Sequence, residues 1–152
     1  MAVADKAGSR SSRTGHLSPS GGLILRAGEL PCVTDPVVRD AEAVPERPVD
    51  AAEGLSKAVL LDESDGAHSA MRRFRLDPGA SVPRHTNTVE HEQYVLAGEY
   101  TVGVDGEDHV VGPGDTLLIP AGTVHRYENT GEEPGRFLCV VPNGDDSIEL
   151  VE

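Results

Sequence analysis

Three histidines and one asparagine have the types and spacing of a metal site. His85, Asn87 and His91 lie within one short stretch, and His125 lies in a second stretch further along the chain. Because side chains alternate across a strand, His85 and Asn87 point to the same face of the strand predicted there. Neutral imidazoles that arrive from separate strands are good ligands for zinc, copper, iron and nickel. The pattern therefore predicts a metal site formed by the three histidines, with Asn87 beside them.

Asn87 can have three different roles at such a site. It can be a weak oxygen ligand, a hydrogen-bond donor to metal-bound water or to substrate, or a turn residue without contacts. An amide oxygen suits hard cations better than iron or zinc beside imidazoles, so we expect the amide to donate a hydrogen bond. Glu92 is the reserve ligand, because a shift of one residue in strand register would exchange its position with that of His91.

Arg72 and Tyr127 are the candidate catalytic residues. Arg72 shares the apolar phase of its predicted strand with Phe74, which directs the guanidinium into the protein. A buried arginine needs a partner, which is either a substrate carboxylate bound through two hydrogen bonds or an acid of the protein itself. Tyr127 shares the phase of His125 and is either a proton donor or part of a cavity wall.

The elements that must position these side chains are short strands. Alternating runs are broken by turn residues, and Asp105-Gly106 is typical of a two-residue hairpin turn. With no sustained helical period, the pattern predicts an all-β sandwich or closed barrel with less than about one tenth helix. The predicted strands cover residues 55–61, 69–76, 81–87, 91–104, 107–111, 115–119, 124–128 and 136–141.

Two stretches of the chain carry a family resemblance. Residues 114–129 fit the pattern G-x5-P-x-G-x2-H-x3-N without a gap, and residues 79–98 follow most of the pattern G-x5-H-x-H-x3-E-x6-G. These are the two cupin motifs, and the chain resembles small single-domain cupins over roughly residues 55–142. Asn87 stands where the second histidine of the first motif is usual. His91 stands where the glutamate is usual, as it does in many small bacterial cupins similar to this chain.

The resemblance implies an all-β, single-domain jelly-roll barrel. From the shared inward phase of the three histidines we expect one divalent transition-metal ion per chain, which is iron, manganese, nickel or zinc. The resemblance also implies a homodimer formed through sheet packing. We expect residues 1–20 to be a disordered tail, because they contain small and polar residues with no apolar period. Residues 21–54 form an irregular N-terminal arm in this interpretation, and residues 55–152 form the cupin β-barrel domain.

Composition excludes several classes of partner. The chain has 152 residues and a net charge of −13, which argues against nucleic acid and against an anionic membrane surface. No run approaches the ~18 apolar residues of a membrane span, and the first residues lack the apolar core of a secretory signal. The two cysteines do not make a disulfide framework. We therefore expect a cytoplasmic protein.

The acid excess indicates either a salt-adapted source or simply an acidic mesophilic protein.

The ligand set has consequences for function. Three histidines and at most one weak ligand leave coordination positions open, which distinguishes a catalytic metal from a closed structural one. We therefore expect a metal-dependent enzyme that acts on a small polar or anionic molecule. The resemblance implies a dioxygenase first and an isomerase or lyase second, since one fold supports many reactions. The alternative is a non-catalytic cupin that binds or senses a small ligand.

Overall fold

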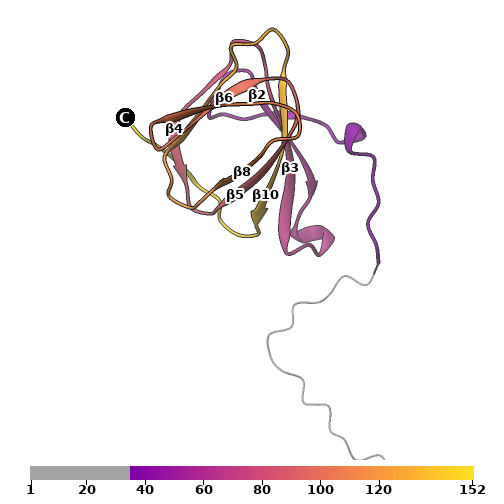
Figure 1. Ribbon diagram of the computed structural model, residues 1–152. Coiled ribbons are helices and arrows are strands. Elements are labelled where there is room, and N and C mark those ends of the chain that lie inside the picture. The colour runs from indigo at the N-terminus through magenta and orange to yellow at the C-terminus, as the bar shows by residue number, and fades with distance from the viewer. Residues whose placement is uncertain (1–34) are drawn as a thin grey trace, which may run out of the picture. The chain divides into compact units, whose positions relative to one another are not determined.

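Two antiparallel sheets form a barrel in the computed structural model, which describes residues 35–152 (Figure 1). The six-stranded sheet has the order β1-β2-β3-β10-β5-β8, and the five-stranded sheet has the order β11-β4-β9-β6-β7. The predicted all-β barrel is therefore confirmed. The predicted tail and residues 21–34 of the predicted arm lie outside the described residues. No helix in the described part is long and apolar enough to cross a membrane.

The strand ends lie close to those predicted from the sequence. Helix is confined, within residues 35–152, to two 3₁₀ turns, η1 (Ala41–Ala43) and η2 (Glu63–Asp65). The strands in chain order are β1 (Arg47–Pro48), β2 (Leu55–Leu61), β3 (Ser69–Leu76), β4 (Ser81–Asn87), β5 (His91–Ala97), β6 (Tyr100–Val104), β7 (Glu107–Val111), β8 (Thr116–Ile119), β9 (His125–Glu128), β10 (Gly135–Pro142) and β11 (Ile148–Leu150).

The predicted strand of residues 91–104 is in fact two strands in different sheets. β5 belongs to the six-stranded sheet, and β6 belongs to the five-stranded sheet. The chain changes sheet at Gly98, which has a φ of +76°, and a Cβ built there would lie 2.5 Å from the carbonyl oxygen of Pro134. Only glycine fits this close approach without strain. Alternation is present on both sides of Gly98, but the buried positions change from odd-numbered residues in β5 to even-numbered residues in β6, a change of phase that the prediction of one strand ignored.

Alternation along β5 fixes which side chains face the interior. His91, Gln93 and Val95 are buried, whereas Glu92 and Tyr94 are exposed on the outer face. A shift of one residue would reverse this arrangement. The register that places Glu92 inside the barrel does not occur, so Glu92 is not in a position to act as the reserve ligand.

Asn129, the last residue of the second motif, is a structural residue. Its side chain is fully buried, and its amide nitrogen donates to the carbonyl oxygens of Leu76 and Glu133, each at 2.9 Å. Its side-chain oxygen accepts a hydrogen bond from the backbone N–H of Gly131 at 3.0 Å. A buried amide with all these partners stabilises the loop after β9, and that strand carries His125.

The described part of the arm, residues 35–54, is more regular than the sequence indicates. Its short strand β1 pairs with β2 at the edge of the six-stranded sheet. Glu42 and Glu46 form ion pairs with Arg73 of β3, at 2.6 Å and 3.3 Å. Arg73 follows the inward-facing Arg72 in β3 and so points to the outer face of the sheet, but it is only 4% exposed because the arm covers it.

Candidate metal centre

A cavity of about 160 Å³ lies in the barrel interior, and the three candidate histidines line it. His85 comes from β4, His91 from β5 and His125 from β9. The ring centroids of His85 and His125 are 4.1 Å apart, and those of His91 and His125 are 6.1 Å apart. All three side chains are buried. Side chains from three different strands thus meet at one place.

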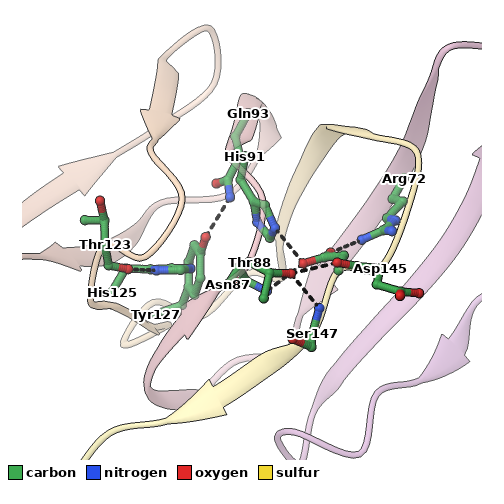
Figure 2. A network of polar contacts seen from close by, with 11 residues as sticks. Arg72, Asn87, Thr88, His91, Gln93, Thr123, His125, Tyr127, Asp145 and Ser147 are labelled. Atoms are coloured by element: carbon green, nitrogen blue, oxygen red, sulfur yellow. Dashed lines mark hydrogen bonds and ion pairs between the residues drawn. The ribbon is translucent and has the colours of Figure 1, made fainter.

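The tautomers of His85 and His125 follow from their backbone contacts. The Nδ1 of His85 lies 2.8 Å from the carbonyl oxygen of Pro83. The Nδ1 of His125 lies 2.9 Å from the carbonyl oxygen of Thr123 (Figure 2). A carbonyl can only accept, so both Nδ1 atoms carry the proton, and each Nε2 keeps a free lone pair. The Nε2 of His125 is buried and has no hydrogen-bond partner among the described residues.

Burial also keeps these two rings uncharged. Desolvation lowers the pKa of His85 and lowers the pKa of His125 to about 4, although the backbone hydrogen bonds oppose the shift. A neutral imidazole is the form that binds a metal ion. The second nitrogen of each ring is held by a carbonyl oxygen, which is the usual support of a metal-binding histidine.

Asp146, in the loop between β10 and β11, is the residue of this site that the sequence analysis missed. Its Oδ2 accepts from Nη1 of Arg72 at 2.5 Å, and its Oδ1 accepts from Nδ2 of Asn87 at 3.0 Å. The Nε2 of His91 lies 3.4 Å from the same Oδ1. Burial by itself raises the pKa of Asp146, but the hydrogen bonds from His91 and Arg72 hold it well below its usual range. The carboxylate is therefore ionised.

The same contacts define the roles of Arg72 and Asn87. Arg72 lines the cavity, as its phase predicts, and its partner in this structure is an acid of the protein. Asn87 is buried at the end of β4, where its amide nitrogen donates to Asp146 and its side-chain oxygen has no partner among the described residues. The sequence indicated only that a buried Arg72 needs an acidic partner. It did not indicate that this partner is Asp146.

Tyr127 and Gln93 form a second polar contact in the cavity wall. The amide nitrogen of Gln93 donates to the hydroxyl oxygen of Tyr127 at 2.6 Å. Burial raises the pKa of Tyr127 well above its usual value, so the phenol stays protonated and can donate a proton or a hydrogen bond. Burial raises the pKa of the nearby Cys139 thiol to about 12, which makes it unreactive as a nucleophile.

Lys57 of β2 adds a second cationic group to the cavity lining, and the sequence analysis also missed it. Desolvation, and next the charge of Arg72, lower the pKa of Lys57. Lys57 is in no ion pair with the acids of residues 35–152, whereas Arg72 is paired with Asp146. The sequence does contain an indication of this position. Lys57 lies two residues from both Leu55 and Val59, so alternation along the strand places it on the same face as these two apolar residues.

An aromatic wall closes another side of the cavity. The ring of Phe137 is stacked on Phe74 at 5.2 Å and on Tyr127 at 5.6 Å between centroids. Apolar and aromatic walls with a few converging polar groups are typical of small-molecule sites. The cavity therefore has an apolar side for the body of a ligand and a polar side for its charged group.

The donor set is chemically suited to a transition metal. Two imidazoles present free Nε2 atoms, and the buried Nε2 of His125 lacks any other partner in the described part. As the side chains stand, no group of three or more His, Cys, Asp or Glu residues within 35–152 is arranged closely enough to enclose an ion. The Nε2 of His91 faces Asp146 instead, so this ring and its neighbours must adjust when an ion binds.

Comparison with known proteins identifies the family to which the chain is similar. Residues 72–141 match the cupin domain family. The oxalate-binding protein of Thermotoga maritima is 33% identical over 114 residues, which are 71% of this chain and 94% of that protein. Gentisate 1,2-dioxygenase from a Ralstonia species is 31% identical over 121 residues, 78% of this chain but 31% of the enzyme. The solved structure of the polyketide cyclase RemF from Streptomyces resistomycificus has a TM-score of 0.73 at 28% identity, covering 78% of this chain and 87% of RemF.

Proposed function

This chain belongs to the cupin family, and on that premise we propose that it is a metal-dependent enzyme acting on a small carboxylic acid. One divalent iron, manganese, nickel or zinc ion binds His85, His91 and His125 in this proposal. The observation that carries it is the free, buried Nε2 of His125 beside the ring of His85. A polar atom buried without a partner is costly, and a metal ion would satisfy it.

The charges of the cavity support an anionic substrate. Lys57 and Arg72 line it, and Asp146 balances only one of these two cations. A buried cation is stabilised by an anion, so a substrate carboxylate fits near Lys57. Oxalate and gentisate, named in two of the relatives, are both carboxylates.

A dioxygenase is the first reaction class, supported by the similarity to gentisate 1,2-dioxygenase. Bound iron would supply the redox chemistry with dioxygen that this reaction needs, and any of the four metals would supply Lewis acidity. The protein's own contribution is to orient the carboxylate through Lys57 and to exclude water by the stacked wall of Phe74 and Phe137. Three histidine ligands leave coordination positions open for reactants.

An isomerase or lyase is the second reaction class, and the similarity to the polyketide cyclase RemF favours it. Such a reaction needs no oxidant but requires a group that donates a proton. Tyr127 is the candidate for this role, because its hydroxyl lies in the cavity wall and carries a proton, and contact with the metal ion or substrate would have to lower its raised pKa for transfer.

A non-catalytic ligand-binding cupin is the alternative from a different class. The similarity to an oxalate-binding protein supports it. A protein that only binds the ligand needs the positive charge of Lys57 to hold the carboxylate. It needs neither the proton of Tyr127 nor a bound metal ion. Metal content and turnover therefore separate the two classes.

The first test is metal analysis of protein purified without added metal, by inductively coupled plasma mass spectrometry. We expect close to one ion per chain in the unmodified protein and less than a tenth of that in His125→Ala. His109→Ala is the matched control, because His109 lies on β7 outside the cavity. The absence of metal in the unmodified chain, even after loading with each of the four ions, would contradict the proposal.

The second test separates catalysis from binding. Iron-loaded protein is mixed with gentisate or oxalate under air, and oxygen uptake and products are measured beside binding by calorimetry. We expect binding that weakens in Lys57→Met, and turnover that depends on the metal. Binding of the acids without turnover for any metal supports the ligand-binding alternative.

A further inference from the structure

We propose that Asp146 is a fourth protein ligand of the metal ion, a carboxylate that the loop between β10 and β11 brings to the three histidines. The inference rests on the proposed metal site. It adds a ligand from outside both sequence motifs, and it places that ligand beside Asn87, where this chain lacks a motif histidine.

The spacing of Asp146 and His91 is that of two ligands on one ion. The Nε2 of His91 and the Oδ1 of Asp146 are 3.4 Å apart, which is long for a hydrogen bond. Two ligand atoms that each lie ~2.1 Å from a metal, at a tetrahedral angle, are about 3.4 Å from one another. The separation of this pair is thus compatible with two ligands of one ion, and the other ligands must adjust to enclose it.

The two oxygens of Asp146 have different partners. Arg72 holds Oδ2 through an ion pair of 2.5 Å, which leaves Oδ1 on the side of the histidines. The amide of Asn87 donates to Oδ1 at 3.0 Å, and one carboxylate oxygen can accept this bond and still bind a metal. Figure 2 shows Arg72, Asn87 and His91 pointing toward this common centre. Arg72 and Asn87 then act as positioning residues for the carboxylate, as is usual around metal-binding acids.

The backbone around Asp146 is fixed to the strand that carries His85. The hydroxyl of Thr88 donates to the carbonyl oxygen of Asp145 at 2.7 Å and accepts from the N–H of Ser147 at 3.1 Å. Beyond the loop, β11 pairs with β4 and places Leu150 opposite His85. The loop therefore holds Asp146 in place before any ion binds, which lowers the entropy cost of using it as a ligand.

A cobalt-binding experiment tests the assignment. Co²⁺ is titrated into the unmodified chain, into Asp146→Asn and into Asp146→Cys, with affinity measured by competition with a chelator and ligands observed by absorption spectroscopy. Asp145→Asn and Asp145→Cys are matched controls, since Asp145 is the exposed neighbour in the same loop. Circular dichroism and thermal melting verify that each variant is folded.

The expected outcome has two parts. Asp146→Asn binds Co²⁺ at least about 100-fold more weakly, because loss of even a supporting partner costs 10–100-fold, and the visible spectrum changes. Asp146→Cys gains a sulfur-to-cobalt charge-transfer band, a signature that only direct contact with the ion produces. Both Asp145 variants keep the affinity and spectrum of the unmodified chain.

Other outcomes overturn the inference in distinguishable ways. Unchanged affinity and spectrum in Asp146→Asn, with no sulfur band in Asp146→Cys, show that Asp146 only pairs with Arg72 and leave the histidine site intact. Failure of the unmodified chain to bind Co²⁺ overturns the proposed metal site as well. If both Asp146 variants fail to fold, a cobalt-loaded crystal structure of the unmodified chain, with the metal located by anomalous scattering, decides between contact and no contact.

Discussion

Asn87 shows how a single amide can change the composition of a metal site. A histidine at this position of β4 would face the cavity beside His85, two residues earlier in the same strand. The amide has no charge and no good nitrogen ligand, but it is a donor, and it donates to Asp146. At the position where the cupin motif usually has a metal-binding histidine, this chain therefore has an amide that holds a carboxylate by a hydrogen bond.

The first prediction at the residue scale concerns Asn87→His. We expect metal affinity to rise, because a fourth imidazole becomes available, and turnover to fall, because that ring occupies a position that substrate needs. Metal competition and steady-state kinetics on the metal-loaded protein measure the two effects. Asn87→Asp is a useful comparison, since it removes the donor and adds a negative charge beside Asp146. Equal metal affinity in Asn87→His and the unmodified chain would show the argument to be wrong.

The second prediction concerns the acid stability of the metal-free protein. His125 has a pKa of about 4 in the folded chain, against an ordinary value of 6.5, so the unfolded chain binds more protons between these values. Stability is therefore fully present above pH 6.5 and falls as pH decreases toward 4, by on the order of 3 kcal/mol for this group. Thermal melting between pH 7 and pH 5 should show the loss, and it should be smaller in His125→Gln. An equal slope in the variant would contradict the prediction.

The sequence predicted part of the site because its residues obey local rules. His85 and His125 lie at motif positions and on the inward phase of strands, so alternation alone places them. Asp146 was missed because it lies in a loop after the last predicted strand, where no periodicity indicates direction. Lys57 was missed because an inward lysine contradicts the usual expectation that lysine faces solvent. Long-range contacts such as that of Arg72 with Asp146 leave no local trace in the sequence.

At the scale of elements, turn chemistry determined where strands begin and end. The hairpin predicted at Asp105-Gly106 is confirmed, because both residues have positive φ values, 49° and 88°, as the two-residue turn between β6 and β7 requires. The break at Gly98 was not predicted, because its cause is a backbone approach from Pro134, far along the chain. Local signals therefore predicted the hairpin, and a tertiary contact determined the change of sheet.

The third prediction concerns the arm that covers β3. Arg73→Ala removes the partner of Glu42 and Glu46 and should lower the free energy of unfolding by about 2 kcal/mol, because the Arg73 side chain is only 5% exposed and leaves Glu46, which is 21% exposed, without its partner. Arg75→Ala is the matched control, because its pair with Asp77 is exposed and should contribute less than about 1 kcal/mol.

Denaturant unfolding of both variants measures the difference between them. Metal affinity should be unchanged in each, because neither Arg73 nor Arg75 lines the cavity. Similar stability losses for the two variants would show that the arm contributes no more than an exposed ion pair.

At the scale of the whole molecule, the outer face of the six-stranded sheet carries a group of exposed apolar side chains. Tyr94 and Leu96 of β5 are 47% and 40% exposed there, and Leu118 of the neighbouring β8 is 62% exposed. Apolar side chains grouped on one face are typical of an interaction surface. We propose that this face forms the interface of a homodimer.

The fourth prediction tests that interface. Leu118→Asp should shift the protein from dimer to monomer in light scattering coupled to gel filtration, because a charge in the centre of an apolar interface is costly to bury. Val110→Asp is the control, since Val110 is 67% exposed but lies on β7 in the other sheet. A monomeric unmodified chain, or a dimer that is equally sensitive to both changes, would contradict the proposed face.

The last prediction concerns the net charge of −13. Most of the acids of the described residues take no part in ion pairs, so their mutual repulsion destabilises the compact state. Salt screens this repulsion as the Debye length falls from ~30 Å at 0.01 M to ~3 Å at 1 M. It also weakens exposed pairs such as Arg126 with Asp108, but each of these contributes only about 0–1 kcal/mol. Repulsion among the excess acids should outweigh that loss. We therefore expect the melting temperature of the metal-free protein to rise steadily with potassium chloride up to molar concentration, and a flat or falling curve would show that the charge excess has no such effect.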